Sequence, residues 1–351
     1  MDRTKLHQAM GTSIRAAVFA LSALAAETGA QPAVNEAVTG SAPTIMSGLA
    51  PAWADAFARQ GGDVRIAAPF GPPQGALDLN FGAFLDGRLA FAFLTREIAE
   101  ADLARYRAGH DGREPCIVPV AGGNWKRFGY ADAVAFIVNR QNPLRRLSFR
   151  QIDSIYASPP LHGGPNARTW GELGLGGSWR HRPIRIKGGD AWSKEESARA
   201  LTVRRQVLSR EGRTGLWTLA PGTGDDQDVV ARVAADPEAI GFTGLGHVEG
   251  AVRVVAINRD GEPAILPTAD TARSGRYPLL RTIDMLVDPH ATASAFPFAH
   301  FLLSRRGQSV IAQQGDFMKL PPGTLQKALR RLDCLKQRRR SGSSTPERLQ
   351  E

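Results

Sequence analysis

The sequence predicts an α/β fold that has room for two packed lobes. Short apolar runs typical of buried strands alternate along the chain with segments whose apolar residues recur at helical spacing. Strands separated by helices favour mostly parallel sheets with helices on their faces. The length of 351 residues is sufficient for two lobes, each with its own hydrophobic core.

In the first half of the chain, the helices and strands follow one another in a regular order. The apolar residues of segment 49–57 share one helix face, and a short strand follows. A loop rich in glycine and proline separates that strand from the next helix. Strands are expected at 64–67, 89–94, 115–119 and 133–138, and helices at 49–57, 76–85 and 148–155, the last with Ser148 as N-cap.

The second half of the chain continues the alternation after a Pro/Gly-rich loop at residues 159–168. Apolar runs predict strands, and an Asp-Pro pair at 236–237 ends one of the helical patterns. Strands are expected at 184–186, 239–242, 252–257 and 280–287, and helices at 195–207, 227–235 and 295–304.

The first 26 residues are typical of a secretory signal peptide. Arg3, Lys5 and Arg15 form a basic start, and an apolar run at 16–26 contains small residues suited to a peptidase. A membrane-spanning helix needs about 20 apolar residues, and this run is much shorter. We therefore expect export to the periplasm, without a lipid anchor, because no cysteine lies near the cleavage region.

The two cysteines, Cys116 and Cys334, leave two interpretations open. An oxidising compartment would permit a disulfide bond, whereas two unrelated thiols are the plainer interpretation of residues so far apart in sequence. Two cysteines do not build a thiolate metal site, and the chain has no paired-histidine motif. We therefore expect no metal and no other cofactor.

The charge of the chain favours acidic partners or substrates. There are 44 basic and 34 acidic residues, a formal net charge of +10. The basic residues are scattered among acidic ones and are not interleaved with aromatic residues, so no nucleic-acid groove is predicted. Residues 326–351 differ in composition and are interpreted as a basic disordered tail.

Taken in order, the segments resemble the phosphate-binding protein family of ABC transporters, which has the type II periplasmic binding-protein fold. The resemblance extends over about residues 38–322, and the order of the segments makes it stronger than any one of them. The segments are 49–57 (LAPAWADAF), 94–97 (LTRE), 131–143 (ADAVAFIVNRQNP), 147–156 (LSFRQIDSIY), 170–174 (WGELG), 239–246 (AIGFTGLG), 275–281 (GRYPLLR) and 301–308 (FLLSRRGQ).

The resemblance implies two lobes joined by two crossing strands, with a ligand in the cleft between them and hinge closure as the working motion. Lobe 1 is expected at 33–137 and 248–322, and lobe 2 at 138–247. The resemblance implies a binding protein and not an enzyme. It implies a monomer that carries a small oxyanion, with phosphate as the first candidate, to an ABC permease of the inner membrane.

A desolvated oxyanion requires fixed hydrogen-bond donors, which hydroxyl groups, helix N-termini and arginine supply well. Phosphate near neutral pH still carries a proton, so a carboxylate acceptor favours it over a fully ionised anion. In the family, four segments at strand-to-helix turns supply these groups. The first contains Ser41, with Thr44 nearby. Two roles remain open for Ser41. Its hydroxyl donates to the ligand, or the residue is only a turn or N-cap serine.

The second and third segments depart in part from the family pattern. In the second, at residues 71–75, two prolines remove N–H groups, and Gln74 remains as a donor. The third is Thr95-Arg96, whose place after a buried strand favours a ligand contact over a surface arginine paired with Glu97 or Glu100. Many members carry an acidic residue in that strand, and this chain has none there.

The fourth segment, which typically reads R-x-x-x-S-G-T, is Gly-Asp-Ala-Trp-Ser-Lys-Glu at residues 189–195. Ser193 is retained, whereas glycine replaces the arginine. Two interpretations stay open. Asp190 or Glu195 replaces the missing acceptor and Lys194 the missing cation, or Ser193 only caps the next helix and Trp192 only packs in the core.

Besides an oxyanion carrier, two other classes of protein are an enzyme and a degenerate binding protein. An enzyme is disfavoured, because the chain has no nucleophile elbow, Walker A loop or Rossmann fingerprint, and its histidines form no recognisable triad. A degenerate binding protein that acts as a sensor or protein-interaction module is the alternative, because the departures fall at the ligand segments.

Overall fold

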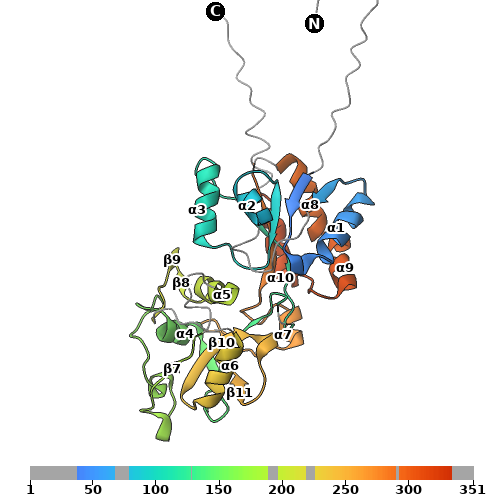
Figure 1. Ribbon diagram of the computed structural model, residues 1–351. Coiled ribbons are helices and arrows are strands. Elements are labelled where there is room, and N and C mark those ends of the chain that lie inside the picture. Colours follow the sequence, from blue (N-terminus) through green and yellow to red (C-terminus); the bar gives the residue numbers. More distant parts are fainter. Residues whose placement is uncertain are drawn as a thin grey trace, which may run out of the picture. The chain divides into compact units, whose positions relative to one another are not determined.

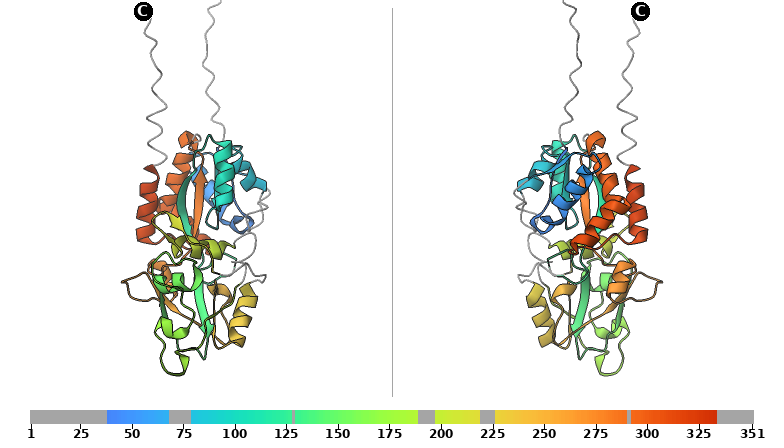
Figure 2. Two further views of the ribbon diagram at one scale, coloured as in Figure 1. Left: turned by 90° about the vertical axis from the view of Figure 1, so that its left-hand side faces the viewer. Right: turned by 90° about the vertical axis from the view of Figure 1, so that its right-hand side faces the viewer.

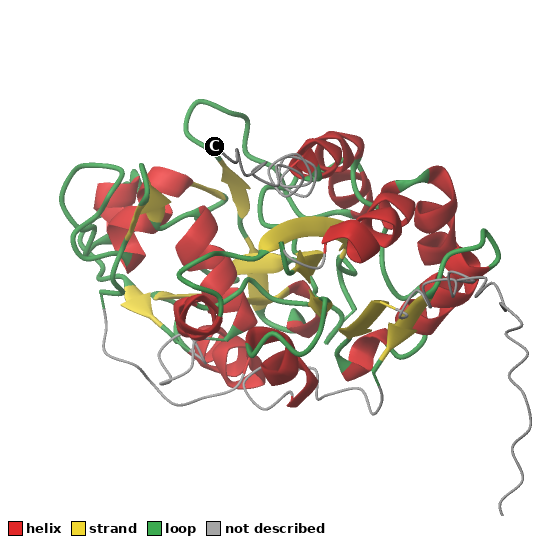
Figure 3. Ribbon diagram, turned by 90° about the horizontal axis from the view of Figure 1, so that it is seen from above, coloured by secondary structure: helices red, strands yellow, loops and turns green. Residues whose placement is uncertain are grey.

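We describe the protein from a computed structural model, in residues 38–67, 79–127, 129–188, 197–218, 226–289 and 292–333. All of these residues belong to one compact unit of the chain. Strands lie between helices, as Figure 3 shows from above. Most strands belong to two separate sheets, each of which contains both parallel and antiparallel pairs. The predicted α/β fold is therefore confirmed, with mixed rather than mostly parallel sheets.

The first sheet has five strands in the order β2-β1-β3-β13-β4. Strand β1 is parallel to β2 and to β3, whereas β13 is antiparallel to β3 and to β4. The strands are β1 Val38–Ser41, β2 Val64–Ile66, β3 Phe91–Leu94, β4 Cys116–Gly122 and β13 Thr282–Val287.

Helices cover both faces of the first sheet, which explains its apolar strands. In β3, Phe91 and Phe93 pack in one core with α1, α8, α9 and α10, whereas Ala92 and Leu94 pack in a second core with α2 and α3. Figure 1 shows these two groups of helices on opposite sides of the sheet, and Figure 2 shows them from the side. The helices are α1 Leu49–Ala58, α2 Leu79–Leu85, α3 Glu100–Gly109, α8 Thr292–Leu303, α9 Arg305–Gln314 and α10 Pro322–Arg331.

The second sheet has four strands in the order β11-β5-β10-β7. Strand β5 is antiparallel to β10 and to β11, and β7 is parallel to β10. The strands are β5 Val134–Asn139, β7 Arg185–Ile186, β10 Ala239–Gly244 and β11 Val252–Val254. We call the first sheet with its helices the first lobe, and the second sheet with its helices the second lobe.

The helices of the second lobe are α4 Phe149–Tyr156, α5 Ala198–Gln206 and α6 Asp226–Ala235. Side chains of α4 and α5 pack with Phe136, whereas those of α6 pack with Ile137 on the other face of the sheet. The predicted N-cap of α4 is confirmed, because the Ser148 hydroxyl accepts the Gln151 N–H at 3.2 Å. The Gln151 side chain in turn accepts the Ser148 N–H at 2.9 Å, which completes a capping box.

Smaller elements complete the two lobes, and one of them, at Thr44–Met46, packs in the core of the first lobe. Strand β6 is parallel to β12, and β8 forms an antiparallel hairpin with β9. The described residues also form five short helices. The elements are β6 Arg146–Ser148, β8 Ser209–Arg210, β9 Arg213–Thr214, β12 Ala256–Asn258, α7 Ala269–Arg273, η1 Thr44–Met46, η3 Trp170–Leu173, η4 Gly177–Trp179 and η6 Leu245–His247.

The single strand predicted at 252–257 is instead two strands in different sheets. The chain leaves β5 at Val255, whose N–H donates to the Phe136 carbonyl at 2.9 Å. The next residue, Ala256, donates to the Arg145 carbonyl at 3.0 Å and starts β12. An apolar run does not reveal such a switch of partner, because both halves are equally apolar.

Two predicted boundaries differ in the structure. Residues from 248 to 280 were assigned to lobe 1, but β11 belongs to the second sheet and Tyr277 and Leu279 lie in its core. Residues 326–331 were assigned to the disordered tail, but they form the last part of α10. In α10, Ala328 is fully buried against the first lobe, which explains why this basic segment folds.

Cys116, at the start of β4, is disulfide-bonded. The other cysteine of the chain is Cys334, which directly follows the last described residue. The Cys116 sulfur also lies 3.8 Å from the backbone oxygen of Arg331, at the end of α10. Of the two interpretations of the cysteines, the structure therefore supports the disulfide. Within the described part of the chain, none of the helices combines the length and apolar character needed to cross a bilayer.

Candidate functional site

Three neighbouring strands of the first sheet end at the same edge. Because β2, β1 and β3 are parallel, their carboxyl ends lie together. The chain leaves the sheet there after Ile66, Ser41 and Leu94. Ligands of open α/β sheets bind outside the carboxyl ends of the strands. The first and third segments predicted from the resemblance, at Ser41 and at Thr95-Arg96, therefore lie at one edge of one sheet, where β2 also ends.

Ser41 is the last residue of β1, and it is 1% exposed. Its hydroxyl oxygen has no hydrogen-bond partner among the described residues. A buried hydroxyl without a partner costs about 1–3 kcal/mol, so this group is suited to receive a polar ligand atom. Thr44 lies three residues further on, exposed, at the start of η1.

The segment Thr95-Arg96 follows β3 at the same edge. Thr95 is 6% exposed, and its carbonyl oxygen accepts a hydrogen bond of 2.6 Å from Arg281. The Arg96 guanidinium forms an ion pair of 2.7 Å with Asp102, and it also donates to the Glu97 carbonyl at 2.9 Å. Its side chain is 13% exposed, so Arg96 is held within the first lobe by α3. The carboxylate that pairs with it is Asp102, neither Glu97 nor Glu100.

The other predicted ligand residues lie outside the described part of the chain. They are Gln74 of the second segment and Asp190, Ser193 and Lys194 of the fourth. The helix after the fourth segment, α5, is capped by Ser197, whose hydroxyl accepts the Ala200 N–H at 3.2 Å. The interpretation of Ser193 as the N-cap of this helix is therefore wrong.

Helix α5 contacts the third segment directly. The Thr202 hydroxyl donates to the Glu97 carboxylate at 2.8 Å, and Thr202 is fully buried. This bond joins the helix that follows the fourth predicted segment to the turn that contains the third. Helix α5 and the turn after β3 are therefore neighbours in space.

A second carboxyl group, Asp284 of β13, lies beside this turn. Asp284 pairs with Leu94, the last residue of β3. Burial raises its pKa to about 6. The hydrogen bond from Thr282, at 2.8 Å, lowers this pKa, and the negative charge of Glu97 raises it. Sequence reasoning missed Asp284, because one acidic residue within an apolar strand gave no recognisable motif.

Asp284 predicts a pH dependence of stability. The folded protein binds its proton more tightly than the unfolded chain, so folding is favoured below the unfolded pKa. This contribution is lost as the pH rises through about 6. Asp284→Asn removes the penalty for the charged form, and we expect it to raise the free energy of unfolding by about 2 kcal/mol at pH 7.5.

Thermal unfolding of Asp284→Asn and wild type between pH 4 and pH 8 measures this effect. The difference in melting temperature should be small near pH 4, should grow as the pH rises to about 6, and should level off above that pH. A difference that does not change with pH would show that Asp284 titrates as an ordinary exposed carboxyl group.

A third polar group, Asp132, lies where the chain passes from the core of the first lobe at Ala131 to the core of the second lobe at Ala133. Asp132 is fully buried, and its Oδ2 accepts the Gly246 N–H at 3.0 Å. A Cβ atom on Gly244 would lie 2.1 Å from this Oδ2 and 2.8 Å from Nε of Arg199 in α5. The Asp132 carboxylate and the Arg199 guanidinium therefore lie close together, and glycine at 244 leaves room for them. This cluster joins α5 to the end of β10, a contact that no sequence motif predicted.

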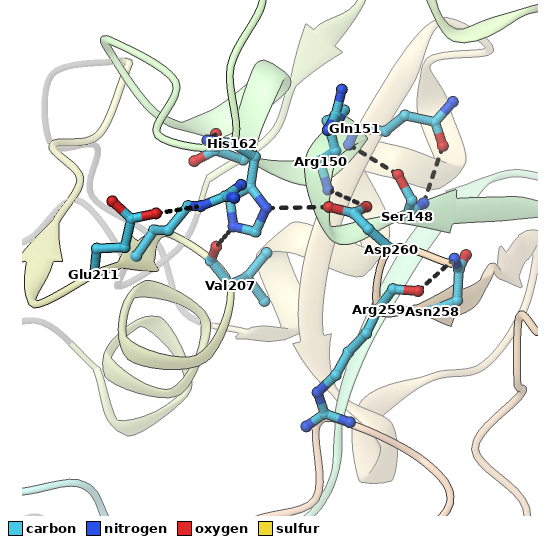
Figure 4. A network of polar contacts seen from close by, with 11 residues as sticks. Ser148, Arg150, Gln151, His162, Val207, Glu211, Asn258, Arg259 and Asp260 are labelled. Atoms are coloured by element: carbon cyan, nitrogen blue, oxygen red, sulfur yellow. Dashed lines mark hydrogen bonds and ion pairs between the residues drawn. The ribbon is translucent and has the colours of Figure 1, made fainter. Parts of the chain in front are cut away.

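The best-defined polar network elsewhere is structural. Figure 4 shows the His162 ring between the Val207 carbonyl, at 2.9 Å, and the Asp260 carboxylate, at 3.3 Å. Asp260 also accepts the Arg150 N–H at 3.2 Å, at the start of α4. Both nitrogens of His162 are engaged, so neither is left to act as a general base. The network connects α4, α5 and the turn after β12.

Comparison with known proteins identifies the family. A family model described as a PBP superfamily domain matches residues 26–306. Because that match spans most of the 351 residues, the chain belongs to the PBP superfamily. Two curated relatives named phosphate-binding protein PstS come from Pseudomonas aeruginosa strains PAO1 and UCBPP-PA14. Each is 26% identical over an alignment 344 residues long, which covers 92% of this chain and 96% of the relative.

Solved structures of similar proteins are also known. An ABC-type phosphate transport receptor from Vibrio cholerae is similar with a TM-score of 0.49 and 16% identity, over 81% of this chain and all of that chain. A PstS from Borrelia burgdorferi is similar with a TM-score of 0.49 and 14% identity, over 80% of this chain and 98% of that chain.

Proposed function

We propose that this protein is an exported solute-binding protein that captures a small oxyanion for an ABC permease, with phosphate as the first candidate. Membership of the PBP superfamily supports a binding role, and the name of the two Pseudomonas relatives supports phosphate. In this proposal the ligand lies between the two lobes, and hinge closure encloses it.

The observation that carries the proposal is the buried Ser41 hydroxyl at the carboxyl end of β1. A hydroxyl at this place meets one lone pair of a desolvated anion. The hydroxyl of Thr44, the segment Thr95-Arg96 and the predicted donors Gln74, Ser193 and Lys194 complete the proposed site, with Asp190 as a further contact. Arg96 takes part with its orientation already fixed by Asp102.

The proposed location is the periplasm, reached through a signal peptide at residues 1–26. The disulfide bond of Cys116 supports this location, because disulfides persist in oxidising compartments and are rare in the cytosol. The proposed protein works as a monomer that docks on the permease with its ligand enclosed.

Ser41→Ala tests the role of the buried hydroxyl. Without ligand, the variant should be as stable as wild type or slightly more stable, because an unsatisfied buried group is removed. With phosphate, it should lose affinity by about tenfold or more, since a hydrogen bond to a charged group contributes about 1.5–3 kcal/mol. Calorimetric titration and thermal unfolding, each with and without phosphate, measure the two effects.

Ser309→Ala is the matched control, because Ser309 is an exposed serine of α9. It should leave phosphate binding unchanged. Equal affinity of Ser41→Ala and wild type would remove Ser41 from the site. Wild type that binds none of phosphate, sulfate, molybdate or organic phosphates would favour the alternative, a sensor or protein-interaction module.

A further inference from the structure

A cavity of about 340 Å³ lies between α1 and α9 on the first lobe. Its lining contains three arginines and two glutamines, together with small or apolar residues, and it contains no carboxylate from the described part of the chain. We call it the arginine cavity. Its polar residues are Arg59, Gln60, Arg305, Arg306, Ser309 and Gln313.

The three arginines come together because α1 and α9 run in opposite directions. The start of α1 lies beside the end of α9, where a Cβ atom on Gly48 would be 3.3 Å from the Gln314 side chain. The end of α1 therefore lies beside the start of α9, and Figure 1 shows the two helices next to each other. Arg59 directly follows α1, and Arg305 and Arg306 are the first two residues of α9.

The charge of these arginines is not opposed by a carboxylate. Arg96 of the same lobe pairs with Asp102 at 2.7 Å, whereas within the described residues none of the three arginines of the cavity forms an ion pair. Arg305 and Arg306 also lie in the first turn of α9, where the helix dipole disfavours positive charge. Charge that is placed against such a local rule is typical of a functional surface.

The arginine cavity is separate from the sheet edge where Ser41 lies. Strands β1 and β2 are parallel and α1 connects them, so α1 runs back from that edge toward the other end of the sheet. Its ten residues span about 15 Å. Ser41 precedes the start of α1, whereas Arg59 follows its end. The occupant of the cavity is therefore not the solute of the proposed function.

The lining indicates the chemistry of the occupant. A guanidinium group binds a carboxylate through two parallel hydrogen bonds, so three such groups favour several neighbouring carboxylates. All the polar residues of the lining are exposed, whereas a site for a small ligand usually buries about 70–90% of that ligand. A lipid surface is usually bound through exposed apolar side chains, and none of the large ones among the described residues lines the cavity.

We propose that the arginine cavity is a docking site for an acidic segment of a partner protein, whose aspartate or glutamate side chains bind Arg59, Arg305 and Arg306. The body of the partner covers the exposed rim, which a small anion does not. Complementary charge of this kind speeds association and selects the partner more than it adds affinity. Binding should therefore weaken as salt is added, because exposed charges are screened.

The test measures binding of a labelled hexaglutamate peptide to the protein by fluorescence anisotropy at low ionic strength. The triple variant Arg59→Ala/Arg305→Ala/Arg306→Ala should bind the peptide about tenfold more weakly or worse, since each exposed charge pair contributes up to about fivefold. Arg140→Ala, which removes an exposed arginine of the second lobe, is the matched control and should change the affinity little.

The triple variant should bind phosphate as wild type does and should melt at the same temperature or higher, because the three arginines have no described ion pair to lose. A lower melting temperature would show that the arginines serve the fold, and it would overturn the inference. Equal peptide affinity of the triple variant and wild type would also overturn it, because the peptide then binds elsewhere, for example at the basic residues 336–340.

Two further probes test the nature of the occupant. Citrate, a small tricarboxylate, should bind much more weakly than hexaglutamate, and vesicles of phosphatidylglycerol should not bind through the three arginines. Citrate binding as tight as that of the peptide and lost in the triple variant would contradict a protein partner in favour of a free small anion. Vesicle binding lost in the triple variant would contradict it in favour of a lipid surface.

Discussion

Replacement of Trp53 by alanine is expected to lower the free energy of unfolding by about 4 kcal/mol, within the range for a buried aromatic side chain. Trp53 lies in α1 and is fully buried, with its ring centroid 5.6 Å from that of Phe93 in the first sheet. Its indole N–H donates to the Gly307 carbonyl in α9 at 2.9 Å. The variant therefore loses both the packing of α1 on the sheet and the bond to α9. Denaturant unfolding followed by circular dichroism measures the loss.

Trp53→Phe serves as the control, because it keeps most of the ring and removes the N–H. It should cost about 1–2 kcal/mol, because the indole bond to the Gly307 carbonyl is lost and the smaller ring leaves a small cavity. If Trp53→Ala cost no more than Trp53→Phe, the packing of α1 against β3 would not be as tight as the structure shows.

Replacement of Cys116 by serine is expected to lower stability by about 2–5 kcal/mol, the usual effect of removing a native disulfide. Cys116 starts β4, and β4 packs against α10 through the first core. The disulfide restricts the unfolded chain, and its sulfur lies near the end of α10. Thermal unfolding of the oxidised wild type and of the variant measures the difference.

Wild type treated with a reductant should unfold at about the temperature of Cys116→Ser, and the reductant should not affect the variant. Oxidised wild type that melts together with the variant would show that the bond does not stabilise the folded chain. Protein purified from the periplasm should contain no free thiol that reacts with a thiol reagent, which would agree with the proposed location.

The sequence predicted the larger elements of the fold well, because their apolar patterns reflect burial directly. The helix at 49–57 and the strand at 133–138 are examples, found at Leu49–Ala58 and Val134–Asn139. Helix α3 was missed, because only Leu103 and Tyr106 of its residues are buried and the rest of its surface is polar. Strand β1 was not predicted, because it is short and contains a glycine. In β1, a side chain at Gly40 would lie 2.2 Å from the Phe91 ring.

The site was predicted in part. Motif resemblance led to Ser41 and Thr95, which the structure places at neighbouring strand ends. The same reasoning did not find Asp284, Asp132 or Arg199, because their proximity to the site depends on strand pairing and on the packing of α5. Such contacts join residues far apart in sequence, and no local spacing encodes them. The ligand contacts of Gln74, Asp190, Ser193 and Lys194 stay predictions, because these residues lie outside the described part of the chain.

The central claim is that an oxyanion binds where the parallel strands of the first sheet end. The most direct measurement is a calorimetric titration with inorganic phosphate. It uses residues 27–351, freed of bound phosphate by prior unfolding and refolding. The account predicts saturable binding to one site, with sulfate weaker by about tenfold or more. No heat of binding and no thermal stabilisation with either anion would contradict it.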